Sequence, residues 1–173
     1  MTAPTQLIDA LVDHVQRFGA RPDARQAAYR WATLEPTLRP FPTPVLLAAT
    51  ARVAGPAIRD RLLASLLRAG GGDEWAELTA LTIVAPRLAW VVRRWALAGV
   101  ASADLADAES DLVTECWAEI RASGGAPPPD APGLALVDRA WTRVRTRRTT
   151  LRRRATHEVL GADTDGQRVA DFH

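Results

Sequence analysis

Residues 73–98 read DEWAELTALTIVAPRLAWVVRRWALA, and this stretch decides the fold class. Its apolar residues recur every three or four positions, at Leu78, Leu81, Ala85, Leu88, Val92 and Trp95. That spacing places them on one face of an α-helix, whereas a strand would alternate every second residue. The stretch therefore predicts one long core helix, with a kink where Pro86 removes a backbone hydrogen-bond donor.

The same helical period continues on both sides of this stretch. No alternating run bounded by hairpin signals occurs, so we expect no strands. The expected helices cover residues 6–18, a segment after Pro22 that contains Tyr29 and Trp31, and residues 45–53, 56–69, 73–98, 103–121 and 134–155. The predicted fold is all-α, a bundle of about six to seven helices.

The organisation along the chain follows from where helix-breaking residues gather. Prolines interrupt residues 35–44, and Gly70 to Gly72 precede an N-cap at Asp73. We therefore expect an N-terminal helical extension over residues 1–72, a helical domain over 73–155 and a flexible, frayed tail over 156–173. The first helix should place Leu7, Leu11, Val15 and Phe18 on one face. We expect Trp75, Trp90, Trp95 and Trp117 to lie mostly in or beside a shared core.

Composition excludes several classes of protein. The chain is 47% hydrophobic and 24% charged, which is typical of a folded globular protein. Its longest uncharged run has twelve residues, 40–51, and contains three prolines, so we expect no membrane-spanning helix. Residues 1–12 lack the basic start of a secretory signal, which favours a cytoplasmic protein.

Catalytic chemistry is constrained in the same way. The chain contains no lysine, which rules out a Walker-type phosphate loop and a lysine Schiff base. Cys116 is the only cysteine, and its neighbours lack metal-ligand spacing, so we interpret it as a small core residue. The sequence thus predicts a protein that is not an enzyme, with no metal site and no cofactor.

Charge is strongly polarised along the chain. Residues 134–154 contain eight arginines and one acid, a net charge of +7, whereas the whole chain carries +2. Guanidinium groups match phosphate oxygens in charge and geometry, which favours contact with nucleic acid. Three alternatives stay open: a solvated arginine face, a genomic arginine bias, and neutralisation by the acidic helix over residues 103–121.

Three segments carry a resemblance to a known family. They are APRL at 85–88, ADAESDLVTECWAEI at 106–120 and AWTRVRTRRTTLRRR at 140–154. In this order they resemble region 2 of the sigma-70 family, especially the small extracytoplasmic-function type. The resemblance covers about residues 73–155. Ser110 interrupts the acidic motif of that family, and no helix-turn-helix resembling region 4 follows Arg154.

The resemblance implies two partners. The acidic helix would bind the core RNA polymerase, and the arginine-rich helix would bind promoter DNA, including its single-stranded region. Carried over to this chain, the polymerase-binding residues would be Glu109, Asp111 and Glu115. The DNA-binding residues would be Arg143, Arg145, Arg147, Arg148 and Arg152.

A second function remains open. A helical interaction module or regulator could use the same charged helices without binding DNA. Trp141 has two roles open to it, because it could pack beside Val137 and Val144 or stack on a base. The N-terminal extension is likewise expected to pack on the second block, the alternative being that it masks one of its faces.

Overall fold

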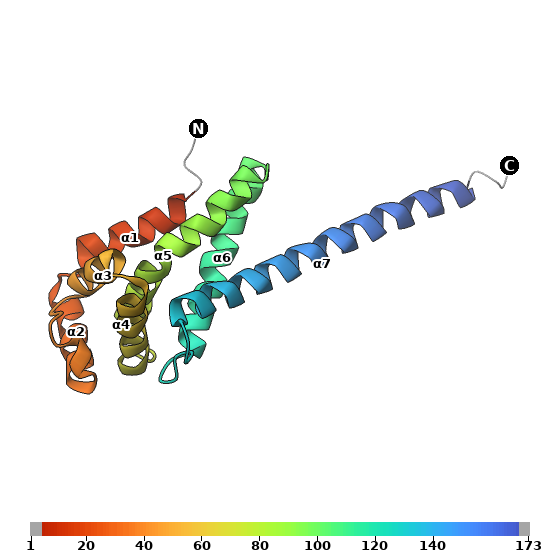
Figure 1. Ribbon diagram of the computed structural model, residues 1–173. Coiled ribbons are helices and arrows are strands. Elements are labelled where there is room, and N and C mark those ends of the chain that lie inside the picture. Colours follow the sequence, from red (N-terminus) through yellow and green to blue (C-terminus); the bar gives the residue numbers. More distant parts are fainter. Residues whose placement is uncertain (1–4, 170–173) are drawn as a thin grey trace.

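The computed structural model describes the backbone of residues 5–169 and the side chains of residues 5–101 and 104–150. Over these residues the chain forms seven α-helices, one short 3-10 turn and no strand, which confirms the predicted all-α bundle (Figure 1). The elements are α1 (Gln6–Phe18), α2 (Pro22–Leu34), η1 (Pro36–Leu38), α3 (Pro44–Val53), α4 (Pro56–Ala69), α5 (Glu74–Leu97), α6 (Ser102–Ala122) and α7 (Pro132–Val169).

Helix α5 is the centre of the bundle. It starts where the Asp73 carboxylate accepts hydrogen bonds from the backbone N–H groups of Trp75 (3.0 Å) and Ala76 (3.2 Å), which confirms the predicted N-cap. Gly72, with a φ of +78°, makes the preceding turn. By length and composition α5 could cross a membrane, but 78% of its apolar window is buried, as in the core helix of a soluble protein.

One hydrophobic core joins the N-terminal helices to the later ones. Trp31, Leu47 and Leu63 belong to the same buried cluster as Leu112 and Leu136. The N-terminal extension therefore packs on the rest of the molecule, as expected. Most of the predicted face of α1 packs inward, because Val15 is buried and Leu11 lies against the core, but Leu7 is exposed and its neighbour Ile8 is buried instead. The buried side of α1 contacts α5 and α6.

The tryptophans divide between the core and the surface. Trp75, Trp95 and Trp117 pack against the buried cluster, as expected. Trp90 is the exception among the four, because its side chain is 54% exposed. Position along the helix explains the difference, since Trp90 shares an exposed side of α5 with Arg93 and Arg94.

Helix α7 is longer than the sequence indicated. It runs to Val169, past the expected end at residue 155 and through most of the segment expected to be a frayed tail, and it projects from the bundle (Figure 1). After Pro132 no further proline follows in the chain, and isolated glycines weaken a helix by only about 1 kcal/mol each. Residues 170–173 and the side chain of Leu151 lie outside the described part.

Candidate nucleic-acid interface

Helices α6 and α7 meet through matching rows of opposite charge. On α6 the acids Asp111, Glu115 and Glu119 recur every four residues, and on α7 Arg139, Arg143 and Arg147 do the same. A four-residue spacing places each row along one helix face. The pairs run Arg139–Glu119, Arg143–Glu119, Arg143–Glu115, Arg147–Glu115 and Arg147–Asp111, so the two helices are antiparallel. We call this set of contacts the arginine ladder.

Three of the arginines predicted to bind DNA pair with acids of α6: Arg143 and Arg147 within the ladder, and Arg148 beside it. The guanidinium of Arg143 lies 2.5 Å from one Glu119 oxygen and 3.7 Å from Glu115. Arg147 donates a hydrogen bond to Glu115, and Arg148 lies 3.4 Å from Asp111 and donates to the Asp104 carbonyl. The pairing of the acidic and basic helices, one of the alternatives left open by the sequence, is therefore present in the structure.

Burial makes the acids of the ladder depend on their partners. The Glu119 side chain is only 4% exposed, whereas its arginine partners are about half exposed. A buried carboxylate without a cation would pay a desolvation penalty, while the half-exposed arginines remain hydrated. The ladder thus stabilises the fold mainly by supplying cations to the buried carboxylates. The outer side of its arginines remains open to water.

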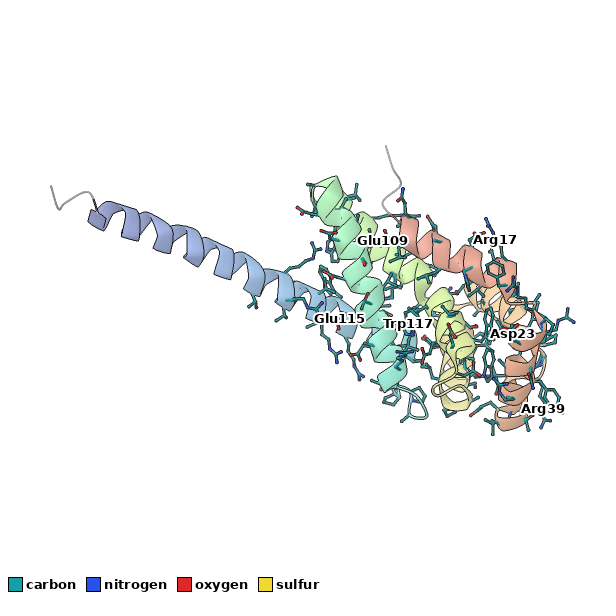
Figure 2. All side chains as sticks on the ribbon, turned by 180° about the vertical axis from the view of Figure 1, so that it is seen from behind. Arg17, Asp23, Arg39, Glu109, Glu115 and Trp117 are labelled. Atoms are coloured by element: carbon teal, nitrogen blue, oxygen red, sulfur yellow. The ribbon has the colours of Figure 1, made fainter. Side chains whose placement is uncertain are left out.

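Glu109, one of the residues predicted to bind polymerase, lies against α1. Its side chain is buried, and its carboxylate accepts a hydrogen bond of 2.9 Å from the backbone N–H of Ile8, in the first turn of α1. Burial raises the pKa of Glu109 above its ordinary value, although the backbone hydrogen bonds oppose this shift. Figure 2 shows Glu109 where α6 passes α1, while Glu115 lies lower on α6 beside α7.

The two other predicted DNA-binding arginines are Arg145 and Arg152. Arg145 is exposed and has no ion pair within the described side chains. The side chain of Arg152 lies outside the described residues. Among the predicted DNA-binding arginines with described side chains, Arg145 is therefore the one that does not pair with an acid of α6.

Arg145 borders an aromatic groove that the sequence did not reveal. The groove has a volume of about 180 Å³ and lies between α5, α6 and α7. Its aromatic part is Trp95 from α5 and Trp141 from α7, whose ring centroids are 4.6 Å apart with planes tilted by 41°. Arg145, Arg148 and Thr149 complete its polar side. Trp95 was predicted as a core residue, and only the packing of α7 shows that it also lines a groove.

Two further features of the described side chains bear on thiol chemistry and on metal binding. Cys116 is fully buried, as predicted, and burial raises the pKa of its thiol to about 12, so the reactive thiolate is scarce at neutral pH. Among the described residues no group of three or more His, Cys, Asp or Glu side chains is placed to hold a metal ion.

Comparisons with protein-family models, curated proteins and solved structures gave no match to this chain.

Proposed function

We propose that this protein is a sigma-like transcription protein, a binding protein rather than an enzyme, which contacts nucleic acid through α7 and acts in the cytoplasm. The observation that carries the proposal is the position of Arg145, an unpaired cation beside the Trp95–Trp141 groove. A cation next to an aromatic surface is the combination that binds single-stranded nucleic acid, because phosphate and base are contacted together. Duplex DNA offers no free base face for such a groove.

The binding mode follows from the contacts around the groove. An unstacked base would enter against the exposed parts of Trp95 and Trp141, and Arg145 would contact the adjoining phosphate. Arg143 and Arg147 would contribute further only by exchanging a carboxylate of α6 for a phosphate, since both are already paired. Because of the ladder, we expect α7 to contact fewer phosphates than its number of arginines indicates.

The polymerase contact of this proposal also needs different residues. Glu109 is held by α1, and Glu115 is held by α7. The acids that α6 leaves exposed are Asp104 and Asp107, with Asp111 partly accessible. We therefore place the polymerase-binding surface at the N-terminal half of α6, where these carboxylates would meet a basic surface of the core enzyme.

A salt series on labelled oligonucleotides tests nucleic-acid binding. We expect a single-stranded or bubble oligonucleotide to bind better than duplex, with affinity falling as salt rises because bound counterions are released. Arg145→Ala should reduce the slope of log affinity against log salt by up to about one unit. The matched control is Arg39→Ala, an exposed arginine at the far side of the N-terminal block (Figure 2), which should leave the slope unchanged.

Polymerase binding is tested separately by co-purification with bacterial core RNA polymerase. Asp104→Arg combined with Asp107→Arg should abolish it, whereas Asp130→Arg in the exposed α6–α7 loop should not.

No binding of any oligonucleotide at 50 mM salt would refute the nucleic-acid proposal. The structure offers one argument for the second candidate, a helical interaction module, because acids of α6 pair with most of the described arginines of α7.

A further inference from the structure

Helix α5 carries an exposed strip that the proposed nucleic-acid interface does not use. It consists of Trp90, Arg93, Arg94 and Leu97, spaced three and four residues apart and therefore on one side of the helix. Trp90 is 54% exposed and Leu97 is 90% exposed. The guanidinium carbon of Arg94 lies 5.3 Å from the centroid of the Trp90 ring, which holds cation and aromatic together. Figure 1 shows α5 running between α1 and α7, while α6 overlies it in the reverse view of Figure 2.

An apolar hollow continues the strip toward the N-terminal helices. It has a volume of about 370 Å³ and is lined by Val15 of α1, by Val45 and Val53 of α3, and by Pro86 of α5. Pro86 lies one helical turn before Trp90 on the same side of α5. Val53 is itself a highly exposed apolar side chain. The hollow and the apolar side chains of the strip, Trp90 and Leu97, therefore lie next to each other on α5.

A second, smaller hollow lies on the other side of the strip. It has a volume of about 240 Å³ between α4, α5 and the start of α7, and its lining includes Ile83, Arg87 and the exposed Leu134. Since Pro86 and Arg87 are adjacent, the two hollows flank the same turn of α5. We call the strip and both hollows the α5 surface.

The α5 surface is positively charged. Arg52 lines the first hollow, and Arg52, Arg93 and Arg94 are exposed with no ion pair within the described side chains. Arg87 has a partner, because its guanidinium lies 3.5 Å from Asp138. Asp60, the acid of the second hollow, accepts a hydrogen bond from the Gly133 N–H. The net effect is a cationic rim around apolar concavities.

We infer that the α5 surface is the docking site for an acidic amphipathic helix of a partner protein. An apolar concavity is filled by apolar side chains, which a helix presents at every third and fourth position. Acidic residues on the flanks of that helix would pair with Arg52, Arg93 and Arg94. Tryptophan and arginine are also the residue types that contribute most strongly at protein interfaces, so Trp90 is the expected anchor.

Nucleic acid and lipid fit this surface less well. A phosphate backbone supplies charge but no side chain to fill hollows lined by Val45, Val53 and Leu134. A bilayer is flat on this scale and would leave the two hollows of the α5 surface unfilled. Trp95, which lines the nucleic-acid groove, lies about 140° around α5 from Trp90. The two surfaces are therefore separate, and this inference does not rest on the proposed nucleic-acid binding.

Selection from a displayed library of amphipathic helices tests the inference. Each library peptide carries a fixed apolar face, and its flanking positions are randomised between glutamate and lysine. We expect the selected peptides to be rich in glutamate, and Trp90→Ala or the pair Arg93→Glu and Arg94→Glu to weaken their binding at least tenfold. Tyr29→Ala and Arg39→Glu, which alter an exposed aromatic and an exposed arginine outside this surface, should change affinity by less than twofold.

Three outcomes would overturn the inference. The first is a selection without preference for glutamate, and the second is binding that neither Trp90→Ala nor the double arginine variant weakens. The third is a tenfold loss of single-stranded DNA or anionic-vesicle binding in those variants while peptide binding stays constant. Arg145→Ala serves as a cross-check, because it should weaken oligonucleotide binding without changing peptide affinity, so that the two proposals can fail independently.

Discussion

The N-terminal helices and α7 are attached to the molecule by different forces. Helices α2, α3 and α4 contribute buried apolar side chains such as Trp31, Leu47 and Leu63 to the common core. Helix α7 contributes Leu136, Val137 and Val144 at its beginning, but the same stretch also lies against α6 through the arginine ladder. Apolar burial is insensitive to salt screening, whereas half-exposed ion pairs are screened. The N-terminal helices are thus held by apolar packing. The α6–α7 contact also includes ion pairs, whose arginines can exchange a carboxylate for another anion.

The largest effect on stability should come from the apolar core of the N-terminal helices. Trp31→Ala removes a fully buried side chain, and we expect a loss of roughly 3 to 5 kcal/mol in the free energy of unfolding, measured by chemical denaturation. Trp31→Phe should cost less, because the indole N–H of Trp31 has no hydrogen-bond partner among the described residues and its removal leaves nothing unpaired. Tyr29→Ala on the exposed side of α2 should change stability by about 0.5 kcal/mol or less. Equal losses in the Trp31 and Tyr29 variants would contradict the described packing.

A smaller effect is expected from the ladder. Arg143→Ala leaves Glu119 buried with Arg139 at 3.8 Å as its remaining cation, and we expect a loss of about 1 to 2 kcal/mol. Adding Glu119→Gln should recover part of this loss, because the buried charge is then gone. Arg17→Ala, which breaks an exposed pair with Asp13 on α1 (Figure 2), should cost about 0.5 kcal/mol or less. Purely additive effects of the two ladder substitutions would show that the pair is not coupled.

The smallest effect concerns the contact of α6 with α1 and depends on pH. Because burial raises the pKa of Glu109, the folded protein holds that proton more tightly than the unfolded chain does. Ionisation of Glu109 therefore reduces stability as pH rises above the ordinary glutamate value. Glu109→Gln keeps an oxygen for the Ile8 N–H, so its Tm should match the parent near pH 4 and exceed it at pH 7. A Tm below the parent at pH 7 would mean that the charge itself holds α1.

Local sequence patterns predicted the helices, but not all of their ends or buried faces. The period of residues 73–98 predicted α5 and its cap at Asp73, because both depend on neighbouring residues. The end of α7 was missed, since no cap or proline marks it. On α1 the sequence predicted Leu11 and Val15 correctly but chose Leu7 in place of Ile8, because both are apolar and only the contact with α5 and α6 distinguishes them.

For the candidate site, the sequence by itself determined which residues carry charge and at what spacing. The rows at Asp111, Glu115 and Glu119 and at Arg139, Arg143 and Arg147 follow from four-residue repeats, as does the concentration of arginine in one helix. Only the tertiary structure decided that the two rows face each other, that Glu109 meets α1, and that Trp95 and Trp141 form a groove while Trp90 lies on an open side of α5. The physical reason is that a helical period fixes directions around one axis, whereas the partner on each side depends on how whole helices pack around a shared core.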